Sequence, residues 1–450
     1  MRKDTLITIL ILVGLVVGAI VGQLLHLGLA DGESISSIWM DLGNIILIRP
    51  LKLLIMPLVF LSVIVGVTSI GDPSRLGVIG GSTVLYYLVT MLLAVILGTA
   101  LVTTIKPGEN IPEETRAMLI DQGETEYQES TKISTAADSA EKRGLGGAWM
   151  NILDQLIPTN VFKELVEVRP LGVIIFALLL GLALAATGPP AAPAISFFAA
   201  LFAGVMKLVL WVLWLTPIGV FFLVTGTVGR IGLEALTGPL SSYMLTVLVG
   251  LAIHGLIILP LILWLLGRCN PFRFMFQMRK ALLTAFGTDS SSATLPVTIE
   301  TAIDEGGCSK RATNFVLPLG ATVNMDGTAL YEAVAVVFLF QFYGIQLEMT
   351  QLIIVVITAT LAAVGAAGIP SAGLVTMVIV ITAVNTSLKG DGVETLPISA
   401  IGIIFGVDRI LDMCRTVVNV WGDSTAAKII TRLAPDDVPS LSDSVEPARQ

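Results

Sequence analysis

The last apolar stretch of the chain, residues 395–431, carries a stripe of polar side chains. Its members lie 4, 3, 1, 3 and 4 positions apart and so share one face of an α-helix: Asp408, Asp412, Arg415, Thr416, Asn419 and Asp423. Ionisable groups inside an apolar segment are costly and by default mark a substrate or ion pathway. The alternative is an Asp412–Arg415 ion pair that only joins helices, but such a pair explains neither Asn419 nor Asp423. For Asp408, nearest the start of the helix, a purely structural role is the alternative.

Two of these residues indicate the class of solute. The guanidinium of Arg415 offers paired donors that match a carboxylate, and Asp412 beside it can accept an ammonium group. Free backbone N–H groups at the N-termini of half-helices favour further anionic groups. One arginine, one aspartate and free N–H groups together predict an acidic amino acid as the substrate.

A second polar cluster is Asn324-Met325-Asp326-Gly327-Thr328. On an intact helix Asn324 and Asp326 would point about 200° apart. A shared site therefore requires the helix to unwind there, which Gly327 makes easier. Oxygen donors with a carboxylate suit a small cation better than a transition metal, which prefers nitrogen or sulfur ligands. Sodium is the favoured ion over zinc or copper.

Glu332 follows on the same segment, one helical turn after Thr328. Burial in an apolar helix disfavours the charged form of a carboxyl group, so Glu332 is a candidate proton carrier. A surface-facing or paired glutamate is the alternative.

The segments that hold these residues must lie in a membrane. The 450 residues are 54% hydrophobic and only 13% charged, and the mean hydropathy is +0.88. This composition excludes an ordinary soluble protein and makes the bilayer the main solvent. The first apolar run lacks a clear cleavage site and is predicted to be a membrane helix, not a signal peptide. Apolar runs, several near the ~20 residues that a spanning helix needs, cover most of the chain: about 6–26, 44–70, 79–104, 171–187, 195–228, 240–267, 310–343, 351–386 and 395–431.

Composition also argues against other classes of protein. The three cysteines are far apart and the two histidines, His26 and His254, show no ligand cluster, so neither a disulfide scaffold nor a zinc site is expected. The formal net charge of −8 says little about nucleic acid except that no basic arm is present, and no nucleic-acid partner is expected.

Two apolar segments are interrupted. Residues Thr288–Pro296 contain a serine run and a proline, and Gly365–Gly373 is rich in glycine. Irregular backbone at membrane depth is tolerated only where it is buried in protein or lines a wet cavity, and a pair of interrupted segments points to the binding site of a transporter. We therefore predict two re-entrant hairpins, about 273–305 and 351–388, over the alternative of two kinked helices.

Charged residues outside the apolar runs predict the orientation. Basic residues lie at the chain start, in the connection 268–280 and at Lys428 and Arg432. Because basic residues are enriched on the cytoplasmic side of membrane proteins, we place these segments and both termini in the cytoplasm. The acidic stretch 107–147 then lies outside as a solvated loop.

Four motifs, in this order along the chain, resemble the dicarboxylate/amino acid:cation symporter family, which includes the excitatory amino acid transporters and archaeal sodium–aspartate symporters. They are Thr288–Pro296, Asn324–Thr328, Gly368-Ile369-Pro370 with Gly373, and Asp412 to Asp423 with Arg415, Thr416, Asn419 and Gly422. The likeness is strongest over 281–432, and Ile157-Pro158-Thr159-Asn160 and Pro217–Phe221 resemble the family too.

The resemblance implies an all-α polytopic membrane protein with eight transmembrane helices and two re-entrant helical hairpins. It also implies a homotrimer in which a transport domain moves as an elevator against a static scaffold. The corresponding divisions are scaffold at 1–75 and 148–235, transport domain at 76–106 and 236–432, extracellular acidic loop at 107–147 and cytoplasmic tail at 433–450.

By the same likeness Arg415 holds the side-chain carboxylate of the substrate and Asp412 its amino group. The remaining substrate shell would be Thr328, Thr416 and Asn419, with backbone from Ser291, Ile369 and Gly373. Sodium would bind three sets of residues: Asp423, Asn419, Asn324 and Gly320; Asp326, Thr90, Tyr87 and Asn324; and the carbonyls of Thr322, Ala363, Val364 and Ala366. Glu332 matches the glutamate that carries a proton in animal members, which adds proton co-transport and potassium counter-transport as options.

The sequence departs from the family pattern at three positions. Met91 stands where relatives often have a second hydroxyl after Thr90, and Met413 stands at the position of a second arginine in animal members. Asp289 replaces the serine or arginine before the serine triplet, and Arg409 is a candidate partner for it.

The principal hypothesis is a multi-pass symporter of the plasma (inner) membrane that imports L-glutamate or L-aspartate with sodium. Moving one negative charge against an inside-negative potential costs ~2.3 kcal/mol per 100 mV, so more than one cation must enter with it. A C4-dicarboxylate or a neutral amino acid symporter is the alternative, against which Asp412 and Arg415 respectively argue. An anion channel is a further alternative, although no pore ring is legible. An enzyme is not expected, because no acid–base dyad accompanies the serine run.

Overall fold

The structure is a computed structural model that describes residues 3–28, 35–70, 73–109, 111–130, 159–167, 170–232, 240–364, 372–390 and 392–436. Every regular element within these residues is a helix. A helix satisfies all its backbone hydrogen bonds internally, which is what an apolar solvent demands. The all-α class predicted from the sequence is therefore confirmed.

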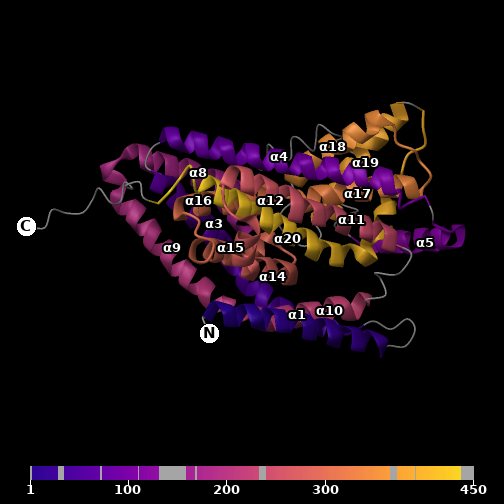
Figure 1. The fold of residues 1–450 in the computed structure, drawn as a ribbon, viewed down its shortest axis with the longest axis horizontal. Coiled ribbons are helices and arrows are strands. Elements are labelled where there is room, and N and C mark those ends of the chain that lie inside the picture. The colour runs from indigo at the N-terminus through magenta and orange to yellow at the C-terminus, as the bar shows by residue number, and fades with distance from the viewer. Residues whose placement is uncertain are drawn as a thin grey trace, which may run out of the picture.

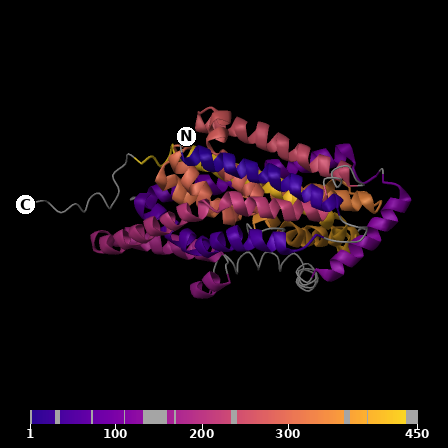
Figure 2. The ribbon, with the colours of Figure 1, turned by 90° about the horizontal axis from the view of Figure 1, so that it is seen from below.

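The N-terminal helix α1 (Lys3–Leu27) packs along α10 (Thr216–Ile231), and the two lie side by side in Figures 1 and 2. Glycines spaced four residues apart on α1 face the partner backbone. A Cβ at Gly14 would lie 2.6 Å from the carbonyl oxygen of Pro217, and one at Gly18 would lie 2.8 Å from that of Phe221. Small residues on one stripe let two apolar helices approach closely where no hydrophobic effect drives them together.

A neighbouring group of helices is built around α3 (Arg49–Ile70), which packs on α8 (Pro170–Thr187) and α9 (Ala192–Leu213). Short elements precede or join these helices: α2 (Ile38–Gly43), the π-helical turn η1 (Asn44–Ile48), α7 (Val161–Val166) and the 3-10 turn η2 (Pro189–Ala191). α3 also contacts α16 of the C-terminal half, so the two groups meet along this helix.

The last long helix, α20 (Phe405–Ile430), runs through the middle of the bundle (Figure 1). The helices in contact with it include α4 (Pro73–Ile105), α11 (Ser241–Ile253), α14 (Arg279–Thr288), α15 (Ser291–Asp304), α16 (Lys310–Val323) and α17 (Asp326–Phe342). Because protein surrounds α20, its polar stripe is shielded from lipid, as the cost of ionisable groups in hydrocarbon requires.

Helix α11 continues through the π-helical turns η4 (His254–Ile258) and η5 (Leu263–Gly267), with α12 (Leu259–Ile262) between them. The short α13 (Pro271–Gln277) follows. It begins at Asn270, whose side chain accepts the N–H of Arg273 as an N-cap.

The first interrupted segment is two helices, as predicted. α14 ends at Asp289, which adopts a left-handed conformation with φ 55, and Ser290 caps α15 by accepting the N–H of Ala293. The predicted unwinding of the second cluster is also confirmed, because α16 ends at Val323 and α17 begins at Asp326. The arms of the other interrupted segment, α18 (Met349–Val364) and α19 (Ala372–Gly390), pack on each other. Their connection, residues 365–371, lies outside the described residues.

The acidic stretch predicted as a solvated loop contains a helix, α5 (Glu113–Glu129), which packs on the 3-10 helix η6 (Ile398–Ile404) at the right-hand end of the bundle in Figure 1. The packing is close at Gly402, where a Cβ would lie 1.9 Å from the carbonyl oxygen of Gly123. Acidic residues at 113 and 114 fall in the first turn of α5, where they favour the helix.

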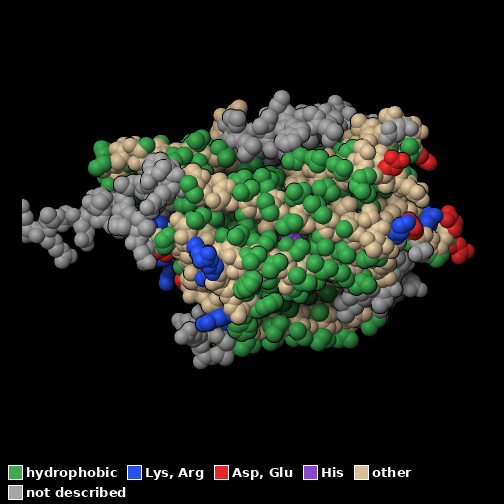
Figure 3. All heavy atoms as spheres, turned by 45° about the horizontal axis from the view of Figure 1, so that its top comes forward, with side chains coloured by type: hydrophobic (Ala, Val, Ile, Leu, Met, Phe, Trp, Pro, Cys, Tyr) green, Lys and Arg blue, Asp and Glu red, His purple; other side chains and the backbone are tan. Residues whose placement is uncertain are grey.

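Among the described residues, seven helical segments are long and apolar enough to cross a membrane, and two shorter apolar helices accompany them. Apolar side chains cover the middle of the face in Figure 3, and charged side chains lie at its two ends. An apolar band between charged ends is the surface that a bilayer requires.

Candidate substrate and cation site

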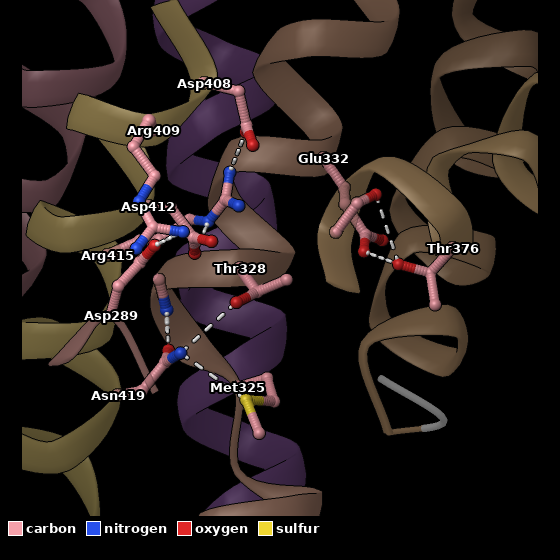
Figure 4. A network of polar contacts seen from close by, with 12 residues as sticks. Asp289, Met325, Thr328, Glu332, Thr376, Asp408, Arg409, Asp412, Arg415 and Asn419 are labelled. Atoms are coloured by element: carbon pink, nitrogen blue, oxygen red, sulfur yellow. Dashed lines mark hydrogen bonds and ion pairs between the residues drawn. The ribbon is translucent and has the colours of Figure 1, made fainter. Parts of the chain in front are cut away.

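Arg415 lies fully buried at the centre of α20 and is held by two carboxylates. Its Nε donates to Asp412 Oδ1 at 2.7 Å and its Nη1 donates to Asp408 Oδ1 at 2.8 Å (Figure 4). The guanidinium carbon lies 4.0 Å from the centre of the Tyr331 ring. Nη2 has no hydrogen-bond partner among the described residues. A buried donor without a partner is costly, so a ligand oxygen that met Nη2 would be bound favourably.

Asn419 joins the substrate stripe to the start of α17. Its Oδ1 accepts the backbone N–H of Gly327 at 2.7 Å, and its Nδ2 donates to Thr328 Oγ1 at 3.2 Å. Thr416, one position after Arg415, is buried as well. The structure thus places Thr328 beside the α20 stripe and brings together the five side chains predicted to surround the substrate: Thr328, Asp412, Arg415, Thr416 and Asn419.

The two hairpins contribute backbone to the same place. Gly373 lies in the first turn of α19, where a Cβ would be 3.2 Å from Thr328 Cγ2 and 3.6 Å from Arg415 Cζ. Ser291 is buried in the first turn of α15. Unsatisfied N–H groups of helix N-termini favour anions. Ile369 lies outside the described residues.

Polar oxygen atoms gather where α4, α16, α17 and α20 meet. Asn324 Oδ1 accepts from Thr90 Oγ1 at 3.3 Å, and Asn324 Nδ2 donates to Asp423 Oδ1 at 3.0 Å. A Cβ at Gly320 would lie 2.4 Å from Asp423 Oδ1 and 2.7 Å from the hydroxyl of Tyr87. These residues come from both sodium sets that the family resemblance implied, and they form one contiguous cluster.

Asp326 lies beside this cluster, because a Cβ at Gly422 would be 2.8 Å from Asp326 Oδ2 and 2.9 Å from Asn324 Nδ2. Asp326 is fully buried, and no described residue forms a hydrogen bond with its Oδ1. Two buried carboxylates, Asp326 and Asp423, flank one asparagine. Burying carboxylates is costly unless positive charge accompanies them, so the cluster fits a small cation.

His254 is a site residue that sequence reasoning missed. Its Nε2 lies 3.2 Å from Asp326 Oδ2, and both side chains are fully buried. The signal available was a histidine inside an apolar run, which is itself a reason to expect a polar partner. Its partner is 72 residues away in the chain, so no spacing pattern could name it.

The third predicted sodium set is described only in part. Thr322 lies in the last turn of α16, and Ala363 and Val364 end α18, which contacts α16. Ala366 lies outside the described residues.

Glu332 is fully buried on α17 and accepts a hydrogen bond from Thr376 Oγ1 on α19 (Figure 4). Its second oxygen, Oε2, has no hydrogen-bond partner in the described part of the chain. The surface-facing alternative for Glu332 is therefore wrong.

Comparison with known proteins identifies the family of the chain. The sequence model of the sodium:dicarboxylate symporter family matches residues 7–433. The chain belongs to this family. It is 38% identical to excitatory amino acid transporter 3 of Oryctolagus cuniculus over 97% of this chain and 86% of the relative. It is 37% identical to excitatory amino acid transporter 2 of Rattus norvegicus over 95% of this chain and 79% of the relative. It is 36% identical to an excitatory amino acid transporter of Caenorhabditis elegans over 97% of this chain and 89% of the relative.

Membership in the sodium:dicarboxylate symporter family establishes the general function of the chain. The chain is a multi-pass membrane symporter that couples sodium to the transport of dicarboxylates or amino acids, and it is not an enzyme. The symporter's fold and family thus agree with the resemblance found in its motifs. Sodium is a transported substrate here, and the oxygen cluster with the unpartnered Asp326 Oδ1 suits it.

Proposed function

We propose that the symporter imports an acidic amino acid, L-glutamate or L-aspartate, together with more than one sodium ion. The observation that carries the proposal is the Arg415 guanidinium, which is buried between Asp412 and Asp408 and whose Nη2 meets no acceptor in the part of the chain that the structure describes. A basic and an acidic group side by side match the side-chain carboxylate and the ammonium group of an acidic amino acid. The excitatory amino acid transporters among the relatives support the same class of substrate.

Binding requires an exchange of partners. In the structure the Arg415 Nε–H occupies Asp412 Oδ1. We propose that the substrate ammonium takes over Asp412 and that Arg415, freed from it, donates to the substrate side-chain carboxylate. Asp408 keeps its contact with Nη1 and holds the guanidinium in place. The α-carboxylate is then left for the N-terminal turns of α15 and α19, with Thr328, Thr416 and Asn419 around the substrate.

Sodium would bind the oxygen cluster next to this site. The proposed sodium sites use three sets of residues: Asp423, Asn419, Asn324 and Gly320; Asp326, Thr90, Tyr87 and Asn324; and Thr322, Ala363, Val364 and Ala366. Asn419 touches the substrate residue Thr328 and belongs to the first sodium set. Substrate and sodium would therefore share one rigid wall, which is a direct route for their coupling.

Glu332 is the proposed proton carrier. It is buried between α17 and α19, and the latter begins beside Arg415. A proton on Glu332 would travel inward with the substrate and add to the positive charge that drives import. Potassium counter-transport is tested by imposing a potassium gradient on proteoliposomes that contain the protein and measuring substrate uptake.

The proposed movement is an elevator in a homotrimer of the plasma (inner) membrane. α4 and α11 to α20 would form the transport domain, and α1 to α3 with α7 to α10 the scaffold. The N-terminus, the 268–280 connection and the C-terminus would face the cytoplasm, consistent with their basic residues.

Substrate identity is tested by uptake into proteoliposomes under an inward sodium gradient. Labelled L-glutamate, L-aspartate, a C4-dicarboxylate such as succinate, and L-glutamine are compared. We expect uptake of at least one of the two acidic amino acids and much weaker uptake of the other two compounds. Succinate uptake that exceeds both would replace this proposal with a C4-dicarboxylate symporter, and L-glutamine uptake that exceeds both would replace it with a neutral amino acid symporter.

A further inference from the structure

The turn of the first hairpin is built on an acidic residue in an unusual conformation. Asp289 joins α14 to α15 with φ 55, in the left-handed region that non-glycine residues rarely adopt. Its side chain is buried, and neither carboxylate oxygen has a hydrogen-bond partner among the described residues. A buried carboxylate in such a turn needs a compensating charge.

That charge comes from α20. Arg409 Nη1 lies 3.0 Å from Asp289 Oδ2, and the arginine side chain is one-quarter exposed. Figure 4 shows the pair directly beside Asp412 and Arg415. Arg415 is already bonded to Asp412 and Asp408. Arg409 is therefore the one basic group in contact with Asp289 within the described part of the chain.

The pair is neutral as a whole, and the loss of either member changes the charge of the substrate site. Three carboxylates and two guanidinium groups meet at the site, and their formal charges sum to −1. They belong to Asp289, Asp408, Asp412, Arg409 and Arg415. Without the charge of Arg409 the same group carries −2, and without the charge of Asp289 it is neutral. A substrate that itself carries a net negative charge is repelled in the first case and tolerated in the second.

We propose that Arg409, through its ion pair with Asp289, maintains the specificity of the site for acidic substrates. Arg409 cancels the negative charge of Asp289 beside Asp412 and ties the turn of the first hairpin to α20. This cancellation lets the site accept an amino acid with an anionic side chain in preference to its uncharged amide. The inference rests on the proposed function, because it concerns the substrate's charge.

The test is equilibrium binding of L-glutamate to the purified full-length protein at saturating sodium, with L-glutamine as the uncharged competitor. R409Q leaves Asp289 without its partner and should raise the Kd for L-glutamate by roughly tenfold or more, with a smaller effect on L-glutamine. D289N should leave the Kd for L-glutamate within about threefold of the wild-type value or lower it. D289N/R409Q, an uncharged pair, should return the Kd to within about threefold of wild type.

A matched control breaks another ion pair of the same hairpin. Arg279 Nη1 lies 3.3 Å from Glu305 Oε2 at the base of the hairpin. R279Q should leave the Kd unchanged within about twofold, and a melting curve for each variant shows that it is folded.

Three results would overturn the inference while the proposed function stands. They are an R409Q protein that binds L-glutamate like wild type, equal weakening in D289N and R409Q, and a double variant as weak as R409Q alone. Equal losses would mean that the pair acts through packing and not through charge. A wild-type protein that binds neither L-glutamate nor L-aspartate would instead overturn the proposed function, and this inference with it.

Discussion

Arg415 and Asp408 lie two helical turns apart on α20 and are joined by a 2.8 Å bond from Nη1 to Oδ1, while Nε of the same guanidinium reaches Asp412. The two carboxylates hold the guanidinium at both edges, and Nη2 has no hydrogen-bond partner within the described ranges of the chain. This arrangement fixes the arginine without using all its donors. A preorganised donor binds its ligand with less loss of side-chain entropy than a mobile one.

Replacement of Arg415 tests its proposed role in substrate recognition. Arg415→Cys should lower uptake of L-glutamate and L-aspartate by ~100-fold or more, because a buried charge-assisted pair is lost. Uptake of neutral amino acids should persist or increase. Arg432→Cys, at the exposed end of the bundle, is the control. L-glutamate affinity equal to wild type in Arg415→Cys would show that another residue holds the side-chain carboxylate.

The oxygen cluster predicts a separate effect on sodium. Asp423→Asn preserves the shape of the side chain and removes a buried negative charge. The sodium concentration for half-maximal uptake should therefore rise by roughly tenfold or more. Asp304→Asn, an exposed aspartate on α15, should leave it unchanged. An unaltered sodium dependence in Asp423→Asn would remove this residue from the sodium sites.

Glu332 is tested through pH. If its carboxyl group carries a proton inward, wild-type uptake should fall as the outside becomes more alkaline, because fewer symporters are loaded with a proton. Glu332→Gln mimics the protonated form and should flatten this dependence. The exposed Glu348→Gln is the control. The same pH profile in Glu332→Gln and wild type would exclude Glu332 as the proton carrier.

The contact between α5 and η6 predicts an effect on stability. A Cβ at Gly402 would lie 1.9 Å from the carbonyl oxygen of Gly123, so Gly402→Ala must push α5 away. We expect a loss of about 1–3 kcal/mol, seen as a lower melting temperature of the purified protein. Gly406→Ala adds the same methyl group where no atom lies within 4 Å, and it should have little effect. Equal melting temperatures for both variants would mean that α5 does not pack on η6.

Local patterns allowed much of the bundle to be predicted. The offsets along 408–423 placed six polar residues on one face of α20, and the opposed directions of Asn324 and Asp326 required the break that separates α16 from α17. The suggestion that Arg409 compensates Asp289 is confirmed by their 3.0 Å ion pair. The binding roles of these residues stay predictions.

Other features depend on contacts between distant parts of the chain. Helix α5 lies in a stretch whose charges suggest only solvation, and its packing depends on glycines in two separate segments. The approach of His254 to Asp326 has no local signal either. The place of Asp408 near the helix start leaves a purely structural role open, and only its 2.8 Å contact with Arg415 identifies it as the second carboxylate beside the guanidinium.

The central claim is the coupling of acidic amino acid transport to sodium. It is tested most directly by the accumulation of labelled L-glutamate and L-aspartate in proteoliposomes of the purified protein, with sodium, proton and potassium gradients imposed one at a time. The account predicts that an inward sodium gradient drives at least one of them above its external concentration. It also predicts that an inside-negative potential increases the accumulation, because more than one positive charge enters with each substrate. Uptake that is indifferent to sodium would contradict it.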